Sequence, residues 1–252
     1  MHPAIINASQ LILLGDIVGA EKTLVEIADQ QGDTALVQIL EDVAPKDLLA
    51  IMREYDGAKD SVLNLLVTPE QFARAVVLNK LYGERNNDKL RGMMNGVIYK
   101  NADTAVDYFA EIYAQDGGVA TLGDYFAGHF EEVCNFAMHA SFDTTPLPFL
   151  ADDGSSDAAE VREFFEVFYS LEHILDKVKW SYTRAEVADG DWKESIWLLF
   201  HELPDAFDHL IGEIQARLLT AQRQSKPREI DPAALENLLL AIGGSDTEES
   251  AI

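Results

Sequence analysis

The sequence predicts an all-α fold, a multi-helix array with an α-solenoid-like N-terminal half of short helices followed by a bundle or hairpin of longer helices. Two observations predict it. Apolar residues recur at spacings of three and four along most of the chain, as on the buried side of an amphipathic helix. Turn and capping residues divide these stretches into segments of helical length. With 252 residues, 48% of them hydrophobic, the chain can also bury a sizeable core.

The first helix with clear boundaries is expected over 17–31. Its apolar stripe consists of Ile17, Ala20, Leu24, Ile27 and Ala28. Asp16 precedes this stripe and Gly32 follows it, and these residue types are favoured at helix starts and helix ends. Asp33 is then expected to cap a further helix over 34–42, because its carboxylate can accept hydrogen bonds from the unpaired amides of a first turn.

Two later segments share a pattern at an offset of 24 residues. Residues 43–52 (VAPKDLLAIM) and 67–76 (VTPEQFARAV) each place a proline at the first helical position, followed by an apolar ladder. Proline is tolerated there because its missing N–H would have no helical partner. With a further helix between them over 56–67, the pattern predicts a helical repeat-like region over 1–140. A chance similarity between two helix starts is the alternative.

This unit resembles the helical repeat in the N-terminal domain of MgtE-type magnesium transporters and its relatives in flagellar switch proteins, over residues 43–80. The resemblance implies an α-solenoid fold. It implies no functional residue, and no transporter domain follows the repeat.

Further helices are predicted over 87–100, 103–115 and 120–140. Gly117 and Gly118 separate the last two, because glycine loses the most conformational freedom when it is held in a helix. Residues 141–157 combine prolines, glycine, serines and acids without an apolar period. They indicate a long loop or a boundary.

Longer helices are predicted beyond this boundary, in an acidic, aromatic-rich region over 157–224. An amphipathic helix is expected over 157–180, and a helical hairpin over 191–203 and 204–224. The tail, 225–252, contains a short amphipathic helix within 231–244, which Asp231 and Pro232 begin and Gly243 ends. This helix is expected to pack on its own body or to enter the groove of a partner.

Charged and aromatic residues are unevenly divided between residues 1–100, the first half, and residues 101–252, the second half. The formal net charge is −25; the first half carries 14 acids and 10 bases, and the second half carries 30 acids and 9 bases. Of the 23 aromatic residues, 19 lie in the second half. Such acidity repels phosphate groups, so direct binding to nucleic acid is not expected. It is typical of a solvated or salt-adapted surface, or of a face for a basic partner.

The expected compartment is the cytoplasm. The single cysteine, Cys134, cannot form an internal disulfide, which favours a reducing environment. The first apolar run follows no Lys or Arg and is interrupted by Asp16, unlike a secretory signal or a membrane span. Membrane insertion is therefore not predicted.

Few residues are candidates for chemistry. The sequence has no phosphate-binding glycine loop, no HExxH or GxSxG motif and no cysteine pair for zinc, so no catalytic residue and no cofactor are predicted. His129 and Glu132, three residues apart, could share a ligand, but we interpret them as residues at the edge of the core.

The strongest candidate is a stripe over 191–212. It consists of Glu194, His201, Asp205, Asp208 and His209. On one continuous helix these side chains would lie within an arc of about 100°, and carboxylates and imidazoles so arranged can bind a divalent metal. We therefore consider His201, Asp205, Asp208 and His209 as metal ligands. The alternative is that Pro204 begins a new helix, which leaves Asp205 and Asp208 as first-turn residues that favour the helix dipole.

The same segment, residues 202–219 (ELPDAFDHLIGEIQARLL), resembles the Pro-Asp-His stretch of molybdoenzyme maturation chaperones, with EVREFF (160–165) in the expected order ahead of it. These are all-helical cytoplasmic proteins that bind the leader peptide of a partner enzyme. The resemblance implies a chaperone-like role. Asp205 and His209 stand farther apart here than in that family, so the resemblance assigns no site.

Three functions remain as hypotheses. The first is a non-enzymatic adaptor or chaperone-like protein whose acidic surface binds a protein with a basic or amphipathic-helical surface. The second is a metal-dependent helical enzyme built on the stripe over 201–209. The third is an acidic mimic of nucleic acid that competes for a basic protein.

Overall fold

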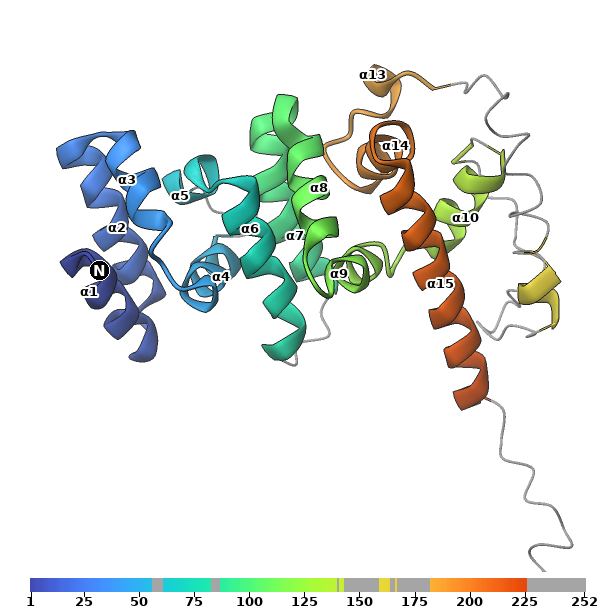
Figure 1. The fold of residues 1–252 in the computed structure, drawn as a ribbon, viewed down its shortest axis with the longest axis horizontal. Coiled ribbons are helices and arrows are strands. Elements are labelled where there is room, and N and C mark those ends of the chain that lie inside the picture. The colour runs from blue at the N-terminus through green and yellow to red at the C-terminus, as the bar shows by residue number, and fades with distance from the viewer. Residues whose placement is uncertain are drawn as a thin grey trace, which may run out of the picture.

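A computed structural model describes residues 1–55, 61–82, 87–139, 141–142, 159–163, 166 and 182–225. Every regular element within these ranges is a helix, and none is a strand. The helices lie side by side along the long axis of the molecule, from α1 (Pro3–Leu13) at one end towards α15 (Pro204–Ser225) near the other (Figure 1). The predicted all-α multi-helix array is therefore confirmed.

Short helices build the first part of the array. They are α2 (Ile17–Gln31), α3 (Asp33–Leu40), α4 (Pro45–Glu54), α5 (Val62–Leu66), α6 (Pro69–Val76), the 3-10 helix η1 (Val77–Tyr82), α7 (Asn87–Ile98) and the 3-10 helix η2 (Tyr99–Thr104). Packing proceeds from one helix to the next: α1 contacts α2, α2 contacts α3 and α4, α4 contacts α6, and α6 contacts α8 (Ala105–Ala114).

The remaining helices surround the far end of this row. They are α9 (Gly118–Tyr125), α10 (Phe130–His139), α13 (Arg184–Val187), α14 (Trp192–Glu202) and α15. α9 packs against both α8 and α15, and α14 packs against the same two helices. The hairpin of α14 and α15 is thereby attached to the array through α8 and α9.

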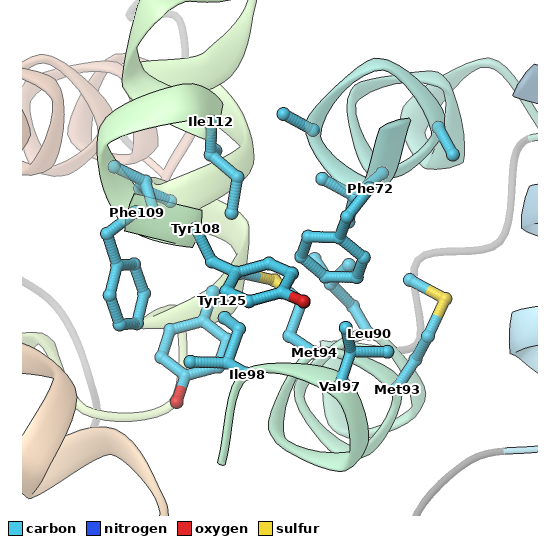
Figure 2. Packing of buried hydrophobic residues seen from close by; sticks show 14 of the residues in the cluster. Phe72, Leu90, Met93, Met94, Val97, Ile98, Tyr108, Phe109, Ile112 and Tyr125 are labelled. Carbon is cyan, nitrogen blue, oxygen red and sulfur yellow. The ribbon is translucent and has the colours of Figure 1, made fainter. Parts of the chain in front are cut away.

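One cluster of buried hydrophobic side chains extends from Ile5 in α1 to Ile214 in α15. Figure 2 shows its middle, where Phe72 of α6 and Tyr108 of α8 meet edge to face with ring centroids 5.5 Å apart. The Tyr108 hydroxyl donates a hydrogen bond of 2.7 Å to the carbonyl oxygen of Val67. The phenol thus fills the core with its ring while its polar atom keeps a partner.

Several predicted helix boundaries are confirmed. α2 begins and ends where the sequence indicates: the Asp16 side chain accepts a hydrogen bond of 2.9 Å from the amide of Gly19, and Gly32 follows the last turn with a φ of 89°. Pro45 and Pro69 are the first residues of α4 and α6. Local capping chemistry was sufficient to locate these starts and stops.

Two predictions in the first half were wrong in detail. Asp33 does not cap a helix from outside; Gly32 is the capping residue, without a side-chain hydrogen bond, and Asp33 is the first residue of α3. The helix expected over 56–67 is shorter, because Ser61 caps it and its first residue is Val62. Residues 56–60 lie outside the described residues.

The single helix predicted over 120–140 is two helices. α9 ends at Tyr125, and α10 begins at Phe130 after a turn in which the His129 amide bonds to the Phe126 carbonyl at 2.8 Å. Gly128 lies in this turn and lowers the cost of leaving the helix. The turn allows α10 to take a different direction from α9 (Figure 1).

Other predictions lie partly or wholly outside the described residues. Of the helix expected over 157–180, only 159–163 and 166 are described, and they are helical. The helix within 231–244 and most of the boundary over 141–157 are outside. The 24-residue repeat and the division into regions 1–140, 157–224 and 225–252 stay predictions.

Candidate functional site

The predicted histidine and aspartate stripe is interrupted at Leu203. α14 ends at Glu202, Leu203 takes φ −135° and ψ 61°, and Pro204 is the first residue of α15. Proline has no N–H with which to continue the hydrogen bonding of α14. The alternative in which Pro204 begins a new helix is therefore confirmed, and the continuous stripe does not form.

The two histidines of the stripe have different surroundings. His201 is half-buried, and its ring centroid lies 4.2 Å from that of Trp197 and 5.0 Å from that of Phe200. Burial lowers the pKa of His201. His209 is exposed, and its Nδ1 lies 2.8 Å from the hydroxyl of Tyr113 on α8. His201 therefore belongs to an aromatic contact within α14, whereas His209 bonds across to another helix.

The carboxylates of the stripe are also separated. Asp205 and Asp208 are exposed near the start of α15, where the positive end of the helix dipole favours them. Glu194 is buried and pairs with Arg184, whose Nη2 lies 2.9 Å from Oε1 of Glu194. Within the described part of the chain, no three His, Cys, Asp or Glu side chains converge so that they could hold a metal ion. The metal assignment stays a prediction without geometric support.

A buried hydrogen-bond network, which sequence reasoning missed, joins α14 to η2, α7 and α9. The fully buried Ser195 hydroxyl on α14 lies 2.5 Å from the hydroxyl of Tyr99 and 2.8 Å from that of Tyr125. Tyr125 donates to Oδ1 of Asn95 at 2.7 Å, and the Asn95 amide donates to Oδ1 of Asp191 at 2.6 Å. We call these five residues the α14 network.

The α14 network positions a helix rather than activating a nucleophile. Burial raises the pKa of Tyr99 and of Tyr125, so both phenols stay protonated and can donate. The hydrogen-bond neighbours of the Ser195 hydroxyl are these two neutral phenols and the backbone carbonyl of Asp191 at 2.9 Å. None of them can act as a general base near neutral pH.

His129 extends this network to α10. Its ring stacks on Trp192, with centroids 4.3 Å apart and an interplanar angle of 12°. Its Nε2 accepts a hydrogen bond from the Arg91 guanidinium, and its Nδ1 lies 3.6 Å from Oε1 of Glu132. Nε of Arg91 is 3.7 Å from Oδ1 of Asp191. His129 thus contacts α7 through Arg91 and α14 through Trp192, while its buried Nδ1 has no hydrogen-bond partner within the described part of the chain.

Arg217 holds α15 against α9. Its guanidinium donates to Oδ1 of Asp124 at 2.7 Å, to the carbonyl of Ala120 at 2.7 Å and to Oε1 of Glu213 at 2.8 Å. Burial acts to lower the pKa of Arg217, but the hydrogen bonds that its guanidinium donates to Glu213 and Asp124 outweigh this effect, and the pKa is raised. Gly123 lies under the guanidinium, where a Cβ would come within 2.8 Å of Cζ.

Acidic side chains of the second half face solvent. Among its described residues, Glu194 is the one buried acid. The exposed acids are Asp103, Asp107, Asp116, Glu160, Glu163, Glu166, Glu186, Asp189, Glu202, Asp205 and Asp208. Over 101–220, the exposed bases among the described side chains are Arg162 and Lys193. We call the exposed acids the acidic surface. Asp103 on η2, Glu202 on α14 and Asp205 and Asp208 on α15 lie on helices that the α14 network and Arg217 connect.

No family model matches this chain, and the comparisons with curated proteins and with solved structures found no match. Neither resemblance drawn from the sequence gains support from these comparisons. Within the described residues, none of the helices combines the length and the apolar character required to span a bilayer.

Proposed function

We propose that this protein is a non-enzymatic helical adaptor, with a chaperone-like role, whose acidic surface binds a basic or amphipathic-helical segment of a partner protein. The observation that supports it is the distribution of charge over a bonded framework: 30 acids against 9 bases in the second half, with all but one of the described acids facing solvent at least in part. A surface potential of one sign attracts an oppositely charged partner and speeds encounter.

The order of the framework strengthens the proposal. Tyr99, Tyr125 and Ser195 connect η2, α9 and α14 through hydrogen bonds of 2.5 and 2.8 Å, and Arg217 connects α15 to α9. Charges carried on helices that are fixed in this way keep their spacing. Binding of a partner then costs less free energy, because the acidic surface is already ordered before the partner arrives.

A charge-matched pair of variants tests the proposal. The second-half variant carries Asp103→Asn, Asp107→Asn, Asp116→Asn and Glu202→Gln. The first-half variant carries Glu26→Gln, Asp29→Asn, Asp33→Asn and Glu41→Gln. All eight side chains are exposed, so each variant keeps its core and changes the formal charge from −25 to −21.

Binding is measured by fluorescence anisotropy with a labelled peptide whose lysines and leucines alternate at helical spacing, at ~0.15 M salt. At a few tenths of a kcal/mol per exposed charge pair, the second-half variant is expected to bind roughly tenfold more weakly. The first-half variant should bind within about twofold of the unmodified chain. Equal weakening of both variants, or no binding by the unmodified chain, would contradict the proposal.

The cytoplasmic location belongs to this proposal, since an intracellular partner requires it. The metal-dependent enzyme and the nucleic-acid mimic stay predictions. His201 and His209 have separate surroundings, which does not favour the metal-dependent enzyme.

A further inference from the structure

The imidazole of His129 lies where three helices meet. Its side chain is 19% exposed, it accepts a hydrogen bond from Arg91 of α7, and it stacks on Trp192, the first residue of α14. His129 also directly precedes α10, whose first residue is Phe130. Its carbonyl oxygen accepts a hydrogen bond of 2.9 Å from the amide of Val133, so His129 is where the hydrogen bonding of α10 begins.

The bond to Arg91 fixes the protonation state of the ring. A guanidinium has N–H donors and no acceptor, so Nε2 of His129 must carry a lone pair. The one proton of the neutral imidazole is therefore on Nδ1. This nitrogen is buried and has no hydrogen-bond partner within the described residues, since Oε1 of Glu132, at 3.6 Å, is beyond hydrogen-bonding distance. The bond between α7 and His129 thus exists only while the imidazole is neutral.

Charged groups surround this ring on all three helices. Among the described residues they are Arg91 and Asp88 on α7, Glu132 on α10, and Asp191 and Lys193 at the start of α14. Asp88 and Asp191 lie 3.4 and 3.7 Å from the Arg91 guanidinium and are paired with it. Glu132 is the carboxylate that faces the ring. A protonated His129 would therefore meet an acceptor beside Nδ1 and a cation beside Nε2.

We propose that His129 is a pH-sensitive switch that ties α10 to α7 at neutral pH and releases it in acid. A histidine gains its second proton between about pH 8 and pH 5. In His129 that proton occupies Nε2, so two positively charged donors face each other and the bond to Arg91 is lost. Nδ1–H then turns towards Glu132, three residues along on α10. A cation is also disfavoured at the N-terminus of a helix, where the dipole is positive.

The switch acts on the start of α14 as well. Nε of Arg91 lies 3.7 Å from Oδ1 of Asp191, the oxygen that accepts the Asn95 amide in the α14 network. Once Arg91 is released from His129, its charge is shared by Asp88 and Asp191 alone. Acid therefore changes the ion pairing at the start of α14 without titrating any member of the α14 network.

His209 shows that a histidine between helices need not behave in this way. Its Nδ1 lies 2.8 Å from the hydroxyl of Tyr113. A hydroxyl can donate or accept, so this bond survives protonation of the imidazole. Arg91 cannot reverse its role as Tyr113 can. The pH response is thus specific to His129, and His209 provides the control.

A double-mutant cycle tests the switch. Arg91→Met keeps the aliphatic stem, and His129→Phe keeps a ring to stack on Trp192. Urea denaturation of the four proteins gives the coupling between the two side chains, and other titrating groups cancel in the cycle. At about pH 8 the coupling should change the unfolding equilibrium constant about tenfold in favour of the folded state, and at about pH 5 it should vanish or reverse. Arg91→Met with His209→Phe should be additive at both pH values.

Nitrogen NMR of the imidazole tests the neutral state in the unmodified chain, so it does not depend on how a variant folds. At about pH 8 His129 should carry its proton on Nδ1 and none on Nε2. A proton on Nε2 at this pH, a coupling that is the same at both pH values, or a coupling of less than about twofold at pH 8 would overturn the proposal. No partner protein enters these experiments, so their outcome is independent of the proposed function.

Discussion

The substitution Gly123→Ala should destabilise the unmodified protein but stabilise a variant that lacks the Arg217 side chain. Glycine to alanine within a helix normally stabilises it by about 1 kcal/mol. In this protein the new Cβ would lie 2.8 Å from Cζ of Arg217, so the guanidinium must shift, at the expense of its bonds to Asp124, Ala120 and Glu213. The Arg217 side chain is 23% exposed, so water replaces part of what is lost.

The expected size follows from these contacts. Hydrogen bonds to charged groups contribute about 1.5–3 kcal/mol each before this solvent compensation, so we expect roughly 2–4 kcal/mol for the set. After the helix gain of about 1 kcal/mol, Gly123→Ala should lower the free energy of unfolding by about 1–3 kcal/mol. In an Arg217→Ala background the obstacle is absent, and Gly123→Ala should raise the free energy of unfolding by up to about 1 kcal/mol.

Urea denaturation of the four proteins at 25 °C measures the coupling, which should be about 2–4 kcal/mol. A Gly123→Ala variant as stable as the unmodified chain, or a coupling below ~0.5 kcal/mol, would refute the placement of the guanidinium over α9. A similar destabilisation in both backgrounds would show that the new methyl group meets some other part of α15.

Three further predictions concern single residues. Tyr125→Phe should lower the free energy of unfolding by about 1–3 kcal/mol, because Asn95 Oδ1 loses its donor. Tyr113→Phe removes an exposed hydrogen bond to His209 and should change the free energy of unfolding by less than ~0.5 kcal/mol. The Cys134 thiol should not react with Ellman's reagent at pH 8 until the protein unfolds, since burial raises its pKa to about 12. Burial lowers the pKa of His201 in the folded state, so the unfolded state binds a proton at this imidazole more readily. The free energy of unfolding, measured by denaturant titration, should therefore fall as the pH drops below about 6.5, and it should fall less in a His201→Gln variant.

Boundaries set by local chemistry could be predicted from the sequence. Asp16 and Gly32 act on the amides and carbonyls of the helix beside them, and Pro45 and Pro69 act through their own backbone geometry. These effects need no knowledge of the rest of the fold. The same reasoning located the start of α15 at Pro204, because the missing N–H of proline argues against the continuous helix that the histidine and aspartate spacing would need.

The break between α9 and α10 and the α14 network could not be predicted in this way. Gly128 alone is a weak signal inside an otherwise helical pattern, and the turn there depends on the packing of both helices. Tyr99 and Ser195 are 96 residues apart, and Tyr125 and Ser195 are 70 apart. Tyrosine and serine carry no spacing rule that could pair them over such distances. A serine within the apolar stretch of α14 was the one available hint.

Glu194 shows what burial of an acid requires in this protein. Its carboxylate is 5% exposed and accepts hydrogen bonds from Arg184 at 3.0 Å and from the Gly190 amide at 3.3 Å. A buried carboxylate without such partners is strongly destabilising. With 9 bases for 30 acids in the second half, few acids can be paired in this manner, so most of them must face water whatever the function. Solvation alone predicts equal behaviour of the two charge-matched variants, and only a binding surface predicts that the second-half variant differs.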